Sequence, residues 1–167
     1  MGFPKLTPAF TAHVVIDAPS PVGSTKAAGL VHVPFIPGLG TFKSEPSYAL
    51  QLDGQIEHGA DYITVDPNGT RARLDVNSLV RDKATGAFVR VNYQGVIDLT
   101  SPAGKVLGGA ADAKTTDFGD AFTSWQLQSG DEKLKALEDK VFVGAGRFIL
   151  EQGKPVIVEY KISEVTV

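Results

Sequence analysis

One stretch of alternating side chains decides the fold of this chain, and its sequence is Arg71-Ala72-Arg73-Leu74-Asp75-Val76-Asn77. Its small and aliphatic side chains point one way and its charged and polar side chains point the other way, which is the period-two pattern of a half-buried β-strand. The next residues, Asp82-Lys83-Ala84-Thr85-Gly86, are typical of a hairpin connection, and residues 88–99 run back with the same alternation. The pair therefore predicts an antiparallel meander.

Further strands extend this meander in both directions along the chain. The expected strands are residues 6–17, 27–35, 48–58, 62–66, 122–128, 141–150 and 155–165. We expect one short helix at residues 132–139, and a flexible loop or lid at the glycine-rich residues 100–119. A sheet of about eight to ten antiparallel strands loses its edges by closing, so we predict an all-β, closed antiparallel barrel. Residues 1–167 are expected to form this single domain.

Composition excludes several classes of protein. The 167 residues include 18 glycines and 10 prolines, which argues against a helix bundle, and no cysteine, which excludes disulfides and thiolate chemistry. Sixteen basic against nineteen acidic side chains argue against nucleic-acid binding. No apolar stretch approaches the ~20 residues that span a membrane. Since neither a signal sequence nor cysteine is present, we expect a cytoplasmic protein.

Several motifs resemble a known family, DUF3237, also called UPF0311. Gly59-Ala60-Asp61-Tyr62 is similar to the family's Gly-Ala-Asp-Trp, and Arg73-Leu74-Asp75-Val76-Asn77 resembles its strand with a central Asp, although Arg is more usual at position 77. Ser129-Gly130-Asp131 and Val141-Phe142-Val143-Gly144-Ala145-Gly146-Arg147 resemble its Thr-Gly-Asp and Phe-Val-Gly-x-Gly-Arg motifs.

The resemblance implies a barrel of the allene-oxide-cyclase and lipocalin kind, which agrees with the strand count. The family's activity is largely unassigned, but its fungal members look like accessory enzymes of natural-product biosynthesis. For this chain the resemblance therefore implies a role in secondary metabolism.

The residues themselves indicate neither a metal nor a cofactor. His13, His32 and His58 lack ligand spacing, and there is no Gly-x-Ser-x-Gly nucleophile motif. Gly144-Ala145-Gly146 lacks the third glycine and the following helix of a dinucleotide site. What remains is acid–base chemistry on a small hydrophobic or aromatic molecule.

Candidate site residues follow if the polar strand faces point into the barrel. A buried carboxylate there would have a raised pKa and would act as base or acid, with tyrosine or arginine stabilising an oxyanion. The predicted catalytic residues are Asp75, Asp61, Tyr62, Arg73 and His58. The predicted ligand-binding residues are Tyr93, Trp125, Phe88, Arg90, Asn77 and Phe122.

Each candidate also has a structural interpretation. The face of Arg71, Arg73, Asp75 and Asn77 is equally typical of a solvated outer wall with cross-strand ion pairs. His58 and Asp61 are also suited to capping a turn, and Trp125 and Tyr93 to packing in the core.

Three functions therefore remain open. The first is a cofactor-independent isomerase or cyclase that acts on a polyketide-like or terpenoid-like molecule. The second is a lipocalin-like carrier of a small hydrophobic ligand, and the third is a solidly packed structural subunit. Barrels of this kind often associate, so a homodimer is also an expectation.

Overall fold

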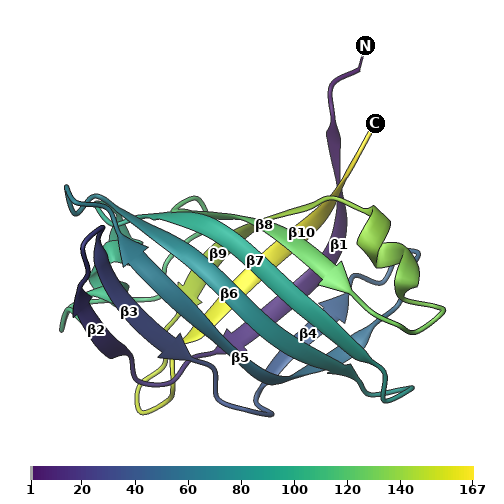
Figure 1. Cartoon of the computed structure of the whole chain (residues 1–167), viewed down its shortest axis with the longest axis horizontal. Helices are drawn as coiled ribbons and strands as arrows, with labels where there is room; N and C mark the ends of the chain where they lie inside the picture. Colours follow the sequence, from purple (N-terminus) through teal and green to yellow (C-terminus); the bar gives the residue numbers. More distant parts are fainter. Residues whose placement is uncertain (1) are drawn as a thin grey trace.

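The computed structural model describes residues 2–167 and is a closed antiparallel barrel of eight strands with two extra strands (Figure 1). In chain order the elements are β1 (Lys5–Val15), β2 (Ser20–Ser24), β3 (Gly29–Pro34), β4 (Gly40–Ser44), β5 (Asp53–Val65), β6 (Arg71–Asp82), β7 (Phe88–Asp98), α1 (Pro102–Leu107), β8 (Ala121–Gln128), η1 (Lys135–Asp139), β9 (Phe142–Ile149) and β10 (Ile157–Thr166).

Strand β5 closes the barrel because it is long enough to pair with three neighbours. One edge of β5 pairs with β6 along most of its length, while the other edge pairs first with β4 and then with β3. The sheet order β2-β3-β5-β4-β1-β10-β9-β8-β7-β6 thus returns to β5, and β2 is added at the free edge of β3. The predicted all-β barrel is confirmed.

The two ends of the barrel are built differently. One end is filled by aromatic rings, among them Phe10, Phe42 and Phe142. The ring centroid of Phe10 lies 4.9 Å from that of Phe42 and 5.6 Å from that of Phe142. The turn that carries η1 covers this end, where Leu134 and Leu137 are buried (light green at the right of Figure 1). The other end is formed by the β2–β3 ribbon, α1 and the β9–β10 connection.

Inward-facing glycines leave room for large rings inside the wall. A Cβ atom on Gly144 would lie 2.8 Å from Trp125 Nε1, and a Cβ atom on Gly146 would lie 2.7 Å from the ring of Tyr160. Because no L side chain fits at such distances, these two positions on β9 admit the aromatic side chains of β8 and β10 to the interior.

The structure corrects the predicted positions of the helix and of some strands. Residues 132–139 form turns and the 3₁₀ helix η1, whereas the α-helix lies in the segment predicted as a loop. Ser101 caps it by accepting a hydrogen bond from the Ala103 N–H at 3.2 Å, and Pro102 occupies its first turn. The predicted strands at 48–58 and 62–66 merge into β5, and β2 and β4 were not predicted.

Candidate functional site

A β-bulge in β5 turns Asp61 into the barrel. The pairing with β6 shifts register between Ile56 and His58, so inward positions change from even numbers, as at Ile56, to odd numbers, as at Asp61 and Ile63. The side chain of Asp61 is therefore buried, with only 7% of the residue exposed. The same shift places Tyr62 outside, where 52% of it is exposed.

Asp61 is a buried carboxyl group with a single backbone partner. Its Oδ1 accepts a hydrogen bond from the Asp75 N–H of β6 at 2.9 Å. Burial raises the pKa of Asp61 to about 7, the Asp75 charge adds to the rise, and the backbone hydrogen bond opposes it. At neutral pH the group is thus divided between its acid and base forms, as a proton-transfer residue requires.

Two tyrosines on other strands accompany Asp61 inside the barrel. Tyr93 on β7 and Tyr160 on β10 are buried, and their ring centroids lie 5.2 Å apart in an edge-to-face arrangement. Burial, Tyr160 and the Asp61 charge raise the pKa of Tyr93 well above its usual value. Burial and the Asp61 charge also raise the pKa of Tyr160. Both phenols therefore stay protonated and serve only as neutral hydrogen-bond donors or acceptors near neutral pH.

Trp125 packs against both tyrosine rings of this group. Its ring stacks on Tyr93 with centroids 3.8 Å apart and meets Tyr160 edge-on at 5.1 Å. The indole Nε1 donates a hydrogen bond of 2.6 Å to Thr123 Oγ1, whose hydroxyl in turn donates to the Gly144 carbonyl at 3.2 Å. Trp125 consequently fixes both tyrosine rings by packing.

The carboxyl group and the two phenols line a small interior cavity, which we call the chamber. Its volume is about 30 Å³, close to that of one water molecule. The rest of its lining is hydrophobic and comprises Val14, Ile16, Val33, Phe35, Ile63, Leu74, Ile97, Leu107, Phe148 and Val158. Asp61, Tyr93 and Tyr160 are thus the only polar side chains that face this space.

A much larger cavity of about 860 Å³, which we call the mouth, opens at the end of the barrel that carries α1. It is lined by residues 16–21, the β3 and β5 walls, the segment 99–109 and residues 154–156. Four aliphatic side chains line both the mouth and the chamber and thus form a collar between them: Ile16, Val33, Ile63 and Leu107.

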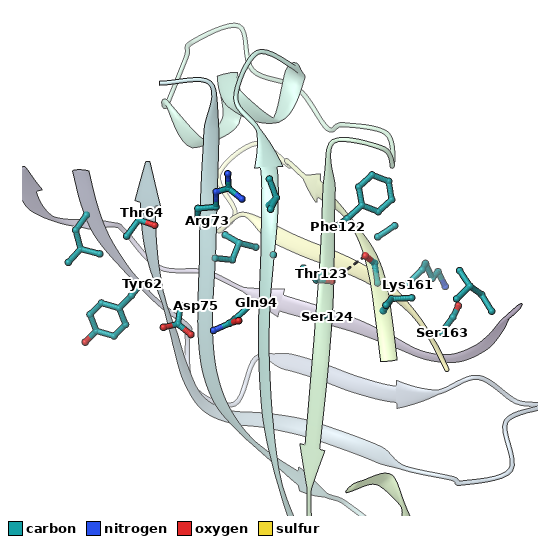
Figure 2. Close-up of a pocket in the computed structure, with 18 residues that line it drawn as sticks. Tyr62, Thr64, Arg73, Asp75, Gln94, Phe122, Thr123, Ser124, Lys161 and Ser163 are labelled. Atoms are coloured by element: carbon teal, nitrogen blue, oxygen red, sulfur yellow. Dashed lines mark hydrogen bonds between the residues drawn. The ribbon is translucent and has the colours of Figure 1, made fainter. Parts of the chain in front are cut away.

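Most of the predicted polar site residues lie on the outer wall. Figure 2 shows Tyr62, Arg73, Asp75 and Phe122 around a shallow outer groove of about 1020 Å³, with Asp75 beside Gln94 on the neighbouring strand. The Arg73 guanidinium donates to both Asp66 carboxylate oxygens, at 2.9 and 3.1 Å, in the cross-strand ion pair considered above.

The remaining outward residues are not near the chamber either. His58 and Phe88 are exposed, and Arg90 donates to Asn77 at 3.3 Å and to Gln128 at 3.1 Å. The sequence analysis placed these side chains in the site on the assumption that they point into the barrel. That assumption is wrong for His58, Tyr62, Arg73, Asp75, Asn77, Phe88, Arg90 and Phe122. The physical reason is that the aliphatic face of β6 gains more by burial than the charged face does.

Of the predicted residues, the structure brings Asp61, Tyr93 and Trp125 together inside the barrel. Tyr160 and the mouth were not predicted from the sequence. The sequence pattern could have indicated Tyr160, because it is the one hydroxyl-bearing residue in the inward row of Val156, Val158, Tyr160 and Ile162. No such pattern indicates the mouth, since it is assembled from segments that lie far apart in the sequence.

Within residues 2–167, no cluster of three or more histidine, cysteine or acidic side chains is placed to hold a metal ion. In the same part of the chain, no helix has the length and apolar character needed to cross a bilayer.

These features define a class of protein: a closed antiparallel β-barrel with a buried carboxyl group and two phenols in its interior. Within that class, the chain belongs to the DUF3237 family of proteins of unknown function, whose model matches residues 4–165. The resemblance noted in the motifs is thereby confirmed. None of the curated proteins matches this chain.

Solved structures share the fold at low sequence identity. A conserved protein of unknown function from Rhodopseudomonas palustris has a TM-score of 0.77 and 17% identity, with 99% of this chain and 100% of that chain covered. A β-barrel-like protein from Acinetobacter baumannii has a TM-score of 0.71 and 22% identity, covering 99% and 98%. A protein described as an enzyme, from Penicillium herquei, has a TM-score of 0.61 and 16% identity, covering 95% and 94%.

Proposed function

We propose that the protein is a cofactor-independent enzyme, an isomerase or cyclase of natural-product biosynthesis, that moves protons on a small hydrophobic substrate. One observation carries the proposal. Asp61, with its pKa raised to about 7, lines the same small chamber as two neutral phenols, and this chamber adjoins the apolar mouth. Perturbed carboxyl groups in such positions are characteristic of acid–base sites.

The reaction needs only groups that the chamber contains. The Asp61 carboxylate takes a proton from a carbon or hydroxyl group of the substrate, and the electron pair moves onto a substrate oxygen. Tyr93 or Tyr160 stabilises that oxyanion with a hydrogen bond, which is effective in a site without bulk water. Protonated Asp61 then returns the proton to a different atom, so that isomerisation or ring closure leaves the enzyme unchanged.

Two further facts support this proposal. The fold fixes the tyrosine rings by packing, and such fixed donors need no reorganisation when charge develops. In addition, one structural neighbour of this barrel is described as an enzyme.

The proposal is tested with 2-tetralone, a two-ring ketone with acidic hydrogens at C1. Proton NMR in deuterated buffer near pH 7 measures the loss of the C1 signal with and without protein. We expect wild-type protein to accelerate this exchange, and Asp61→Asn to reduce the protein-dependent rate by about 100-fold, a typical contribution of a general base.

Asp75→Asn provides the matched control, because it neutralises an exposed carboxylate on the neighbouring strand and keeps the backbone N–H that bonds to Asp61. Its exchange rate should stay close to that of wild type, because the Asp75 charge is the smallest cause of the shifted pKa of Asp61. An identical rate for Asp61→Asn and wild type would contradict the proposed role.

The carrier function remains the second candidate, and the small chamber favours it. A space for one water molecule does not admit a ring, so a ligand that stays in the mouth would be bound without being transformed. Tight ligand binding with no exchange in any variant would favour the carrier.

A further inference from the structure

The walls of the mouth are apolar apart from two charged side chains that are exposed to solvent. Among its lining residues only Asp17 and Lys154 are charged, and both are exposed at the rim. The Asp17 carboxylate accepts a hydrogen bond from the Ala18 N–H at 2.7 Å, and Lys154 pairs with Glu151. All other lining residues are apolar or contribute glycine backbone, so a buried charge on the ligand would lose hydration without gaining a partner.

The chamber disfavours anionic ligands for a second reason. Its only ionisable side chains are Asp61, Tyr93 and Tyr160, and it contains no cationic side chain. An anion that entered would meet a carboxyl group with no compensating positive charge. A neutral ligand with a hydroxyl or carbonyl group, in contrast, finds hydrogen-bond partners on all three residues.

From these observations we infer that the mouth is the binding compartment for an uncharged hydrophobic molecule, whose polar end passes the collar to reach Asp61. The volume of about 860 Å³ lies within the range of about 300–1,000 Å³ found for small-molecule pockets. The contact between the polar end of the ligand and Asp61 rests on the proposed function. Binding of the ligand in the mouth does not depend on it.

Leu107 is the member of the collar that does not belong to the barrel wall. Ile16, Val33 and Ile63 belong to the strands or the turn next to them, whereas Leu107 ends the six-residue helix α1. The start of α1 is fixed, because Ala103 is fully buried and a Cβ atom on Gly104 would overlap Leu99. Gly108 and Gly109, which follow Leu107, are exposed.

The segment after α1 is bonded to the barrel wall at Thr115 and Thr116. The Thr115 hydroxyl accepts a hydrogen bond from the Leu150 N–H at 2.9 Å. The Thr116 N–H donates to the Phe148 carbonyl at 2.9 Å, and the Thr116 hydroxyl accepts from the Phe148 N–H at 3.0 Å. Displacement of the C-terminal turn of α1 would therefore join the mouth to the chamber without disturbing the barrel.

The experiment compares three naphthalene probes that differ in charge: neutral 2-naphthol, the anion 2-naphthoate and the cation 2-naphthylmethylammonium. Calorimetry at pH 7 gives their dissociation constants for the full chain. We expect 2-naphthol to bind at least about tenfold more tightly than either charged probe. Equal affinities for the three probes, or no binding of 2-naphthol at millimolar concentration, would overturn the inference.

Two matched variants locate the site. Val106→Lys places a charge in the mouth from α1, whereas Val96→Lys places the same charge in the outer groove. Val106→Lys should weaken 2-naphthol binding by about tenfold or more, and Val96→Lys should leave it unchanged. The reverse result would assign the ligand to the outer groove and overturn the inference.

Asp61→Asn separates this inference from the proposed function. It should bind 2-naphthol within about threefold of wild type, since the mouth supplies most of the contact area. Neutral-selective binding together with an absence of proton exchange would contradict the enzyme and leave the binding compartment established. Proton exchange without naphthol binding would contradict the compartment alone.

Discussion

The carboxylate of Asp61 accepts its hydrogen bond from the backbone of Asp75, whose own side chain lies on the opposite surface of the wall. Two acidic residues of neighbouring strands are thus joined by one bond of 2.9 Å but lie in different environments. One is buried with two phenols, and the other faces solvent beside Gln94. The pair offers a matched comparison for experiments on the interior.

The first prediction concerns stability and pH. The folded-state pKa of Asp61 is raised from 3.8 to about 7, so between these values the native state binds a proton that the unfolded chain has lost. Stability due to this residue is therefore greatest below about pH 4 and falls as pH rises through about 7.

The substitution Asp61→Asn removes this loss of stability at higher pH, because the amide does not ionise. Relative to wild type, its free energy of unfolding should increase progressively between pH 4 and 7 and level off above, by on the order of a few kcal/mol. Urea denaturation at a series of pH values measures the difference. Asp75→Asn should move this pH dependence only slightly to lower pH, because the Asp75 charge is the smallest cause of the shifted pKa of Asp61. A pH-independent difference for Asp61→Asn would argue against the raised pKa.

The second prediction concerns the phenols. Tyr160→Phe removes a hydroxyl group from the chamber without changing the ring that packs against Trp125. We expect the protein-dependent exchange of 2-tetralone to fall by about tenfold to 100-fold, because an oxyanion donor is lost. Tyr62→Phe, on the exposed outer wall, should have no effect. Equal losses in both variants would indicate a structural cause.

The third prediction concerns the interior glycines. A Cβ atom at position 146 would lie 2.7 Å from the Tyr160 ring, so Gly146→Ala must displace a buried aromatic side chain. Its free energy of unfolding should fall by about 1–3 kcal/mol, the usual cost of overpacking. Gly130→Ala, at a glycine with no atom within 4 Å of its added Cβ, should be neutral in the same denaturation assay.

Sequence periodicity was sufficient for the second half of the barrel. Strands β6 to β9 alternate between buried and more exposed residues, because the inner face packs in the core and the outer face is closer to solvent. Strand β10 departs from this pattern at Glu159, which is buried between Val158 and Tyr160. The alternation pattern did not predict the strand β2. Pro21 and Gly23 indicate a break, but β2 pairs only with β3 outside the barrel, where an edge strand tolerates them.

The candidate site was harder to predict than the fold for one physical reason. A single bulge between Ile56 and His58 reverses the inward face of β5, and nothing in the local sequence marks it except Gly59. A Cβ atom on Gly59 would lie 2.4 Å from the Phe35 ring, a contact between distant segments that appears only after folding. The bulge thus determines that Asp61, and not Tyr62, faces the chamber.

The last prediction separates the two compartments at Leu107. Leu107→Trp enlarges the collar side chain, so 2-naphthol should still bind in the mouth while the exchange of 2-tetralone falls by about tenfold or more. Leu107→Ala should keep binding and raise the exchange rate, because a smaller side chain leaves the passage to Asp61 open.

Val106→Ala is the control for shortening a side chain on α1, since Val106 lines the mouth but not the chamber. It should leave the exchange rate unchanged. Calorimetry and proton NMR on the same samples measure binding and exchange separately. If Leu107→Trp lowered both by the same factor, the mouth and the chamber would act as one site, and Leu107 would contribute only to ligand packing.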